Sequence, residues 1–276
     1  MSGKVYVVGT PIGNLEDITY RAVRILGEVD LIAAEDTRVT LKLLNHFGIK
    51  KPLISCHEHV TPEIIEGIVN RVAAGENCAV VSDAGMPCIS DPGADIVTLC
   101  RDRDIPVEVV PGPTAVASAA AVCGLPAYRF SFEGFLSTAK KQRTEHLVQV
   151  SALPETLIFY ESPHKLLDTF RDMLKILGDR RIAICHELTK LHESVIRTTL
   201  SEAPSFYEGA KPKGEFVLVI EGAKKDEKGS YTLEDAAAIA AKHIEDGMKP
   251  TEACRLAAGI TGFSRSDIYE KTVKDR

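Results

Sequence analysis

The strongest constraint on the fold is a regular alternation of short, β-branched apolar runs with longer segments of helical periodicity. In the first part of the chain, strands are predicted at residues 4–8, 31–34, 52–56, 78–81 and 107–110. Helices are predicted between them at 15–26, 40–47, 62–74 and 94–103. Short strands separated by helices form βαβ units, so we expect an α/β domain with a parallel sheet.

A second α/β series follows the sequence Pro111-Gly112-Pro113. Its helices are predicted at 114–123, 143–150 and 164–177, and its strands at 130–134, 156–160, 181–185 and 214–221. The charged stretch 224–230 predicts a linker. Beyond it the pattern is purely helical and suits a small helix-turn-helix-like module with its turn from Gly259 to Gly262. The expected domains are therefore 1–115, 116–223 and 231–276.

Charge and cysteine content exclude some classes of protein. With 33 basic and 39 acidic residues, the net charge of −6 excludes a strongly basic nucleic-acid coat. Residues 249–276 hold six basic and four acidic residues, which suits RNA contact or an ordinary solvated face. The seven cysteines show no C-x-x-C spacing, so reduced thiols are expected. Without a signal-peptide pattern or an apolar run long enough to span a bilayer, we expect a cytoplasmic protein with no membrane partner.

Three loops that follow predicted strands are candidates for ligand binding. In the loop 9–14, Gly9 and Gly13 lie four residues apart and Pro11 lacks an N–H donor, so a phosphate cradle is disfavoured. A ligand without phosphates, or a plain tight turn, fits this loop. The third loop, 111–115, contains Thr114, whose hydroxyl could cap the next helix or contact a ligand.

The second loop, Ser82-Asp83-Ala84-Gly85-Met86-Pro87-Cys88-Ile89-Ser90-Asp91-Pro92-Gly93, is the most informative. It is crowded with Gly, Pro and Asp and follows a buried strand, at the edge where open α/β sheets bind ligands. Asp83 could accept a hydrogen bond from a ligand amine or hydroxyl, whereas Asp91 is predicted to cap the helix that starts near residue 94.

Two polar clusters lie outside these loops. Cys56-His57-Glu58-His59 offers possible metal ligands, but no further ligand cluster follows at finger spacing, so no metal site is predicted. Lys140, Lys141 and Arg143 form a basic cluster that suits either contact with an RNA backbone or a solvated helix start.

Several segments together identify a family. They are GTPIGNLEDITYRAV (9–23), AAEDTR (33–38), SDAGMPCISDPG (82–93), PGPTA (111–115), GLP (124–126), FEGFL (132–136), LIFYESPH (157–164), HELTKLHE (186–193), KGEFVLVIEG (213–222) and KPTEACRLAAGITGFSRSDIYEKTV (249–273). Through them the chain resembles the tetrapyrrole methylase superfamily, the class III fold of S-adenosylmethionine methyltransferases. Within it, the resemblance is to the enzymes that methylate ribosomal RNA of the small subunit, and it covers nearly the whole chain.

The resemblance implies methyl transfer from S-adenosylmethionine to the ribose 2′-oxygen of a cytidine in the decoding region of 16S rRNA. It also implies a homodimer and a cofactor folded into the cleft between the two α/β domains. The residues that it assigns to cofactor binding are Pro11, Asp83, Met86, Thr114, Ala115 and Tyr160.

A ribose hydroxyl is weakly acidic, so a nearby base would help its attack on the methyl group. The candidates within the matching motifs are Glu35, Asp36 and Glu161, although loop carboxylates also serve as helix caps and ion-pair partners. Arg38 could hold a phosphate through its planar guanidinium group.

The chain departs from the family pattern at three positions. Met86 stands where Thr is usual, Ser137 where Pro is usual, and His186 where Arg is usual. The last change puts an anionic contact in doubt, since histidine is only partly charged near neutral pH. Two other functions compete with the first: a small-molecule tetrapyrrole methyltransferase, and a non-catalytic RNA-binding assembly factor on the same fold.

Overall fold

The computed structural model describes residues 2–209, 211–224, 231–245 and 248–274. The chain forms two compact units, Met1–Gly222 and Ala223–Arg276, and the first unit contains two β-sheets. The boundary predicted between residues 115 and 116 stays a prediction. All but the first residue of the predicted linker at 224–230 lies outside the described residues. No helix in the described ranges is long and apolar enough to cross a membrane.

The first α/β domain follows the predicted alternation. Its elements are β1 (Val5–Val8), the 3-10 helix η1 (Leu15–Asp17), α1 (Tyr20–Glu28), β2 (Leu31–Ala34), α2 (Thr37–His46), β3 (Leu53–Ser55), α3 (Pro62–Ala73), β4 (Cys78–Val81), α4 (Ala94–Asp102) and β5 (Val107–Val110). The strand order is β3-β2-β4-β1-β5, and every pair is parallel, which confirms the expected parallel sheet.

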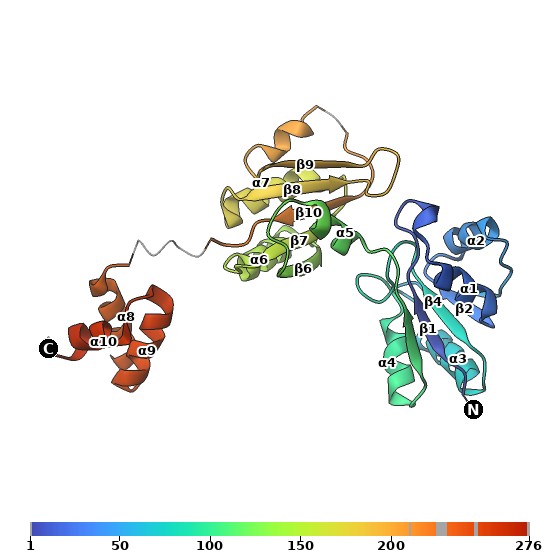
Figure 1. Cartoon of the computed structure of the whole chain (residues 1–276), viewed down its shortest axis with the longest axis horizontal. Coiled ribbons are helices and arrows are strands. Elements are labelled where there is room, and N and C mark those ends of the chain that lie inside the picture. Colours follow the sequence, from blue (N-terminus) through green and yellow to red (C-terminus); the bar gives the residue numbers. More distant parts are fainter. Residues whose placement is uncertain (1, 210, 225–230, 246–247, 275–276) are drawn as a thin grey trace. The chain divides into compact units, whose positions relative to one another are not determined.

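Both faces of this sheet are covered by helices (Figure 1). Ile25, Leu26 and Leu44 of α1 and α2 pack on one face, and Ile68 and Ile96 of α3 and α4 pack on the other. Burial on both faces explains why β2 and β4 read as continuous apolar runs.

Two helix starts in the first domain differ from the prediction. The predicted helix at 15–26 is divided: Asn14 caps the short helix η1, and the hydroxyl of Thr19 accepts from the Ala22 N–H to start α1. α2 begins at Thr37, three residues earlier than predicted, because the Asp36 carboxylate caps it.

The second α/β domain has a mixed sheet. Its elements are α5 (Ala115–Val122), β6 (Phe130–Phe135), α6 (Lys140–Val150), β7 (Thr156–Glu161), α7 (Leu166–Leu177), β8 (Arg181–His186), β9 (Ser194–Thr199), the 3-10 helix η2 (Ala203–Phe206) and β10 (Phe216–Ile220). In the order β6-β7-β10-β8-β9, β6 and β7 are parallel and the other pairs are antiparallel. β9 was not predicted, because this edge strand is only half-buried and shows no continuous apolar run.

The two faces of the second sheet have different partners. α6 and α7 cover one face through side chains such as Leu147 and Phe170. On the other face, Ala119 of α5 packs together with Ile12 from the loop after β1 and Leu188 from the loop after β8. Side chains of both α/β domains therefore share this hydrophobic cluster.

The second unit consists of α8 (Leu233–Glu245), α9 (Pro250–Thr261), α10 (Arg265–Tyr269) and the π-helical turn η3 (Glu270–Lys274). Its core contains Ala236, Cys254 and Ile268. The predicted turn from Gly259 to Gly262 is wrong at its first residue, because Gly259 lies at an exposed position inside α9. Gly262, with a φ of +74°, ends that helix in the left-handed region.

Candidate active site

Three loops meet where neighbouring strands of the first sheet end. β4, β1 and β5 are adjacent and parallel, so the loops 9–14, 82–93 and 111–114 leave from the same edge. The Thr10 N–H donates to the Gly85 carbonyl at 2.9 Å, and the Gly85 N–H donates to the Thr10 carbonyl at 3.1 Å. The first two loops are thus tied together at the edge where such sheets bind ligands.

Gly9 and Gly112 allow the first and third loops to touch. A Cβ atom on Gly9 would lie 2.8 Å from the Gly112 Cα and 2.7 Å from the Met86 Sδ. Both distances are well inside the optimal separation of about 3.5–4.0 Å between carbon atoms. These glycines serve close packing between loops.

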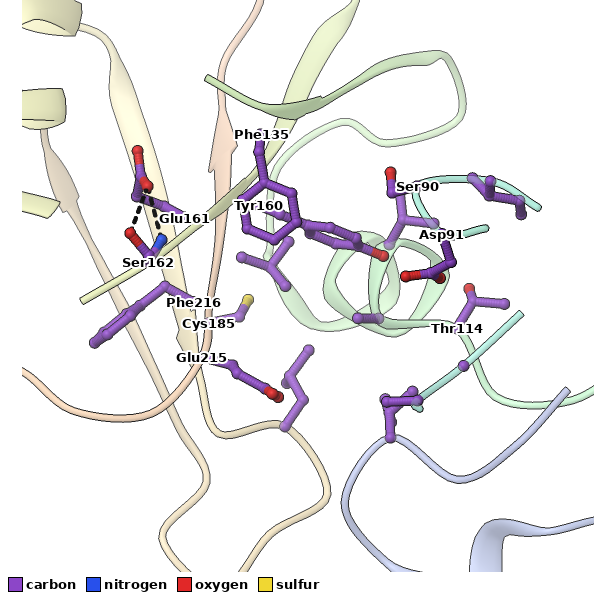
Figure 2. Close-up of a pocket in the computed structure, with 18 of the residues that line it drawn as sticks. Ser90, Asp91, Thr114, Phe135, Tyr160, Glu161, Ser162, Cys185, Glu215 and Phe216 are labelled. Carbon is purple, nitrogen blue, oxygen red and sulfur yellow. Dashed lines mark hydrogen bonds between the residues drawn. The ribbon is translucent and has the colours of Figure 1, made fainter. Parts of the chain in front are cut away.

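A cavity of about 340 Å³ lies beside the loops (Figure 2). Its walls come from the loop 82–93, the start of α5, the end of β7 and the segment that leads into β10. Four of the six residues predicted to bind a cofactor line it, namely Met86, Thr114, Ala115 and Tyr160. Pro11 and Asp83 instead line a separate cavity of about 200 Å³ beside α2. The Thr114 hydroxyl also caps α5, where it accepts from the Ala117 N–H at 3.1 Å.

Tyr160 forms an aromatic wall of the larger cavity. Its ring makes edge contacts with Phe132 and Phe135, with centroid separations of 4.8 and 5.5 Å. Burial raises the pKa of its hydroxyl; the Asp91 carboxylate adds to this rise, and a hydrogen bond with the Val116 backbone opposes it. Figure 2 shows the hydroxyl directed toward Asp91.

Asp91 is the residue of this cavity that sequence reasoning misassigned. Its predicted role as a helix cap is wrong, because Gly93, with a φ of +111°, occupies the cap position of α4 and no side chain caps that helix. Asp91 lines the cavity. Burial, followed by the charges of Glu35 and Asp83, raises its pKa to about 6. A cavity carboxyl group with a pKa near neutrality is typical of proton-transfer sites.

Glu161 reaches the same cavity but is fully engaged. Its carboxylate accepts from the Ser162 N–H at 2.7 Å and from the Thr169 hydroxyl at 2.5 Å. It also pairs with the Lys165 ammonium group at 3.1 Å. These bonds hold the buried carboxylate in place and leave it poorly suited to act as a mobile base.

Glu35 and Asp36 link the end of β2 to the second loop. The Asp36 N–H donates to the Asp83 carboxylate at 3.0 Å, and the Asp83 N–H donates to Glu35 Oε2 at 3.2 Å. Asp36 also pairs with Arg38 at 2.6 Å, and hydrogen bonds from Arg38 lower the pKa of Asp36 to about 2. Such an acid is a poor proton acceptor at neutral pH. Arg38 itself is 87 % exposed.

The basic cluster at the start of α6 divides into two kinds of residue. Lys140 and Lys141 are exposed. Arg143 is buried: its guanidinium group pairs with Asp172 at 2.7 Å and donates to the Ser137 carbonyl at 3.1 Å. The prediction that Arg143 contacts RNA is therefore wrong for this structure, because the group is enclosed and paired.

The remaining departures from the family pattern have local roles. His186 Nε2 lies 2.7 Å from the Lys213 carbonyl oxygen, and its ring stacks on Phe216 with a centroid separation of 4.4 Å. The Ser137 hydroxyl accepts from the Ala139 N–H at 3.1 Å, just before α6. Both side chains stabilise turns near the cavity.

The loop after β8 joins the two α/β domains, a role that the sequence did not reveal. A Cβ atom on Gly13 would lie 2.7 Å from the Thr189 hydroxyl oxygen, so the loop 9–14 packs directly on the loop after β8. Glu187 and Thr189 have φ values of +51° and +65°, which are uncommon for residues other than glycine. The segment HELTKLHE (186–193) matches the family pattern, and this match was the signal in the sequence that could have indicated a role for the loop.

The polar segment at 56–59 contains a local hydrogen bond between its two histidines. His57 Nδ1 accepts a hydrogen bond from the His59 N–H at 3.1 Å. Across the part of the chain that the structure describes, no group of three His, Cys, Asp or Glu side chains is placed to hold a metal ion.

The chain is similar in sequence to several bacterial proteins that bear one name, Ribosomal RNA small subunit methyltransferase I. It is 46 % identical to the protein from Halalkalibacterium halodurans, over 97 % of this chain and 93 % of that protein. It is 50 % identical to the protein from Thermotoga maritima, over 80 % of this chain and 99 % of that protein. The protein from Synechocystis is 42 % identical, over 99 % of this chain and 98 % of its own length.

Solved structures with the same fold are more distant in sequence. Uroporphyrin-III C-methyl transferase from Thermus thermophilus, complexed with S-adenyl homocysteine, matches with a TM-score of 0.55 and 21 % identity, over 78 % of this chain and 97 % of that one. Diphthine synthase matches with a TM-score of 0.60 and 14 % identity, over 80 % of this chain and 90 % of that one. The model of the Tetrapyrrole (Corrin/Porphyrin) Methylases matches residues 4–204. The chain belongs to the tetrapyrrole methylase family.

Proposed function

We propose that the chain is a methyltransferase that uses S-adenosylmethionine to methylate the ribose 2′-oxygen of a cytidine in the decoding region of 16S rRNA. The observation that carries this proposal is the cavity of about 340 Å³ between the loop 82–93 and the second sheet. It occurs in a chain that is 42–50 % identical to proteins named Ribosomal RNA small subunit methyltransferase I.

The cavity suits S-adenosylmethionine in size and in polarity. Ligand cavities of roughly 300–1,000 Å³ are common for small molecules, and this one lies within that range. Ile12, Leu188 and Val217 supply apolar walls for an adenine ring, while Asp91 supplies negative charge to complement a sulfonium group. When bound, the cofactor supplies an electrophilic methyl group.

The predicted cofactor residues divide into two sets in this proposal. Met86, Thr114, Ala115 and Tyr160 contact the cofactor, since they line the cavity. Pro11 and Asp83 act through the loops that they hold, because they line the neighbouring cavity and Asp83 binds the backbone at the start of α2.

Asp91 is the residue that we assign to accept the proton of the ribose hydroxyl. Its raised pKa, about 6, leaves it ionised at neutral pH and yet more basic than an ordinary aspartate. Within the described residues its carboxylate has no hydrogen-bond or ion-pair partner that would occupy its oxygens. General bases of this kind contribute about 10²–10⁴-fold to rate, and correct placement of the nucleophile contributes further.

The RNA is proposed to lie along exposed basic side chains. Arg38 lies three residues after Glu35 and is 87 % exposed. Lys140 and Lys141 are exposed at the start of α6. Phosphate contacts of this sort position RNA without reading its sequence. We also propose that the enzyme acts in the cytoplasm as a homodimer. A monomer mass in analytical ultracentrifugation would contradict the dimer.

Methyl transfer to three classes of acceptor tests the function. Protein and labelled S-adenosylmethionine are incubated with naked 16S rRNA, with unmethylated small subunits, or with a tetrapyrrole precursor. Label on rRNA or on subunits supports the proposal. Label on the tetrapyrrole alone contradicts it and indicates a small-molecule methyltransferase. Absence of transfer to every acceptor, with no binding of the cofactor, indicates a non-catalytic protein.

A further inference from the structure

A further cavity with polar walls adjoins the proposed cofactor cavity. We call it the second cavity; it is distinct from the cavity of about 200 Å³ beside α2. The second cavity has a volume of about 380 Å³ and lies at the ends of β2 and β3. The two cavities share Ile89, Ser90 and Asp91, so this short stretch of the loop 82–93 forms the wall between them. A group in the second cavity is therefore separated from the first by a few side chains, one of which is the proposed base.

Two side chains of this second cavity, Glu35 and His57, come from neighbouring strands. β2 and β3 are parallel, and Ala34 pairs with Ser55 at their carboxyl ends. Glu35 directly follows β2, and His57 lies two residues beyond β3. The pairing of the strands thus brings an acid and an imidazole to one edge of the sheet, in the lining of one cavity.

The hydrogen bonds of these side chains define what each can still do. Glu35 Oε2 accepts from the Asp83 N–H at 3.2 Å, and within the described residues Glu35 Oε1 has no hydrogen-bond partner. His57 Nδ1 accepts from the His59 N–H at 3.1 Å, so the hydrogen of the neutral ring lies on Nε2. Glu35 therefore offers a free acceptor, and His57 offers a free donor.

An acceptor from Glu35 and a donor from His57 match the base-pairing edge of cytosine. Cytosine has a donor, its exocyclic amine, beside a ring nitrogen that accepts. Uracil has the opposite order, an acceptor beside a ring N–H. Enzymes that act on a flipped-out nucleotide read it through hydrogen bonds to this edge.

The charge of the cavity favours a base and disfavours a phosphate. Glu35, Glu58, Asp91 and Asp95 all contribute to its lining. Their carboxylates repel a phosphodiester but accept hydrogen bonds from an amine. The exposed Arg38, near the same edge, is suited to hold the backbone outside.

We propose that this second cavity is the nucleobase subsite, in which Glu35 accepts from the cytosine amine and His57 Nε2 donates to the ring nitrogen. The inference rests on the proposed function, and it adds the residues that select cytidine over uridine.

The test compares small subunits that carry cytidine or uridine at the methylated position. Wild-type protein is expected to prefer cytidine in kcat/KM. In Glu35→Gln, the amide oxygen can still accept from the Asp83 N–H, but its NH₂ presents a donor to the cytosine amine. The cytidine-to-uridine ratio of kcat/KM is expected to fall by about tenfold to hundredfold, the range for one well-formed base contact. His57→Phe is expected to lower the same ratio and provides a second, independent variant.

Two controls separate folding and cofactor binding from base selection. Glu66→Gln changes a glutamate of α3 that is 61 % exposed and lines neither cavity, so it is expected to keep the wild-type ratio. Calorimetric binding of S-adenosylmethionine is expected to be unchanged in Glu35→Gln, because Glu35 does not line the cofactor cavity.

The outcomes distinguish the two proposals. Equal rates of wild-type protein on both kinds of subunit, or equal losses on both in the two variants, overturn the nucleobase subsite alone. Absence of transfer by wild-type protein to either kind of subunit overturns the proposed function, and the subsite with it.

Discussion

Replacing Asp91 by asparagine is expected to stabilise the protein above pH 6 while removing most of its methyl transfer. The pKa of Asp91 is raised from 3.8 to about 6, chiefly by burial, so the folded state holds this proton more tightly than the unfolded state. A difference of about 2 pH units corresponds to roughly 3 kcal/mol. The carboxyl group is only half-buried, and solvent screening reduces the expected gain to about 1 kcal/mol.

The sign of this effect depends on pH. Below about pH 4, both states hold the proton and the wild-type protein bears no cost. As the pH rises from about 4 to 6, the unfolded state ionises first, and wild-type protein loses stability relative to Asp91→Asn. Above that window the difference is constant. Urea unfolding at several values from pH 4.5 to pH 8 measures it.

Activity is expected to change in the opposite direction. Loss of a general base lowers single-turnover methyl transfer by about 10²-fold or more at saturating cofactor. Asp102→Asn, at the end of α4 and 54 % exposed, is the matched control and is expected to change neither property. An Asp91→Asn protein that is less stable than wild type at pH 8, or that keeps full activity, would refute the reasoning.

Four further changes have distinct expected results. Gly9→Ala places a Cβ atom 2.8 Å from backbone, so it is expected to cost about 1–3 kcal/mol in urea unfolding and to weaken S-adenosylmethionine binding in calorimetry; unaltered binding would contradict this. Arg143→Ala breaks a buried ion pair and is expected to cost about 3 kcal/mol in the same unfolding measurement. Lys140→Ala with Lys141→Ala is expected to leave stability within about 0.5 kcal/mol, but to weaken rRNA binding and its dependence on salt. Removal of Ala223–Arg276 is expected to preserve methyl transfer with a higher KM for subunits, since the Thermotoga maritima protein matches 80 % of this chain with 99 % of its own length; complete loss of transfer would contradict it.

Much of the fold could be predicted because burial leaves a clear pattern in the sequence. β2 and β4 are buried on both faces and read as unbroken apolar runs, and such runs between helical segments indicate a parallel sheet. β9 is a half-buried edge strand; its β-branched residues favour a strand, but polar positions interrupt the apolar run by which the buried strands were predicted. Helix starts were shifted where a side chain such as Asp36 caps the helix earlier than the apolar pattern begins.

The site was harder to predict, because the same residue type performs structural and chemical tasks. Asp91 sits three residues before α4, where a cap is common, yet Gly93 takes that position and leaves the carboxylate to the cavity. Arg143 belongs to a basic cluster in sequence, but helical rotation points it inward onto Asp172. Glu161 could not be distinguished from a catalytic base until its three hydrogen-bond and ion-pair partners were known.

Mapping the methyl group on 16S rRNA tests the central claim most directly. Unmethylated small subunits are incubated with the protein and S-adenosylmethionine, and the digested rRNA is analysed by mass spectrometry, with Asp91→Asn in parallel. The account predicts one cytidine in the decoding region that gains a single methyl group on its ribose, and at least a hundredfold slower gain with the variant. A methyl group on a base, or rRNA left unmodified while a tetrapyrrole is methylated, would contradict it.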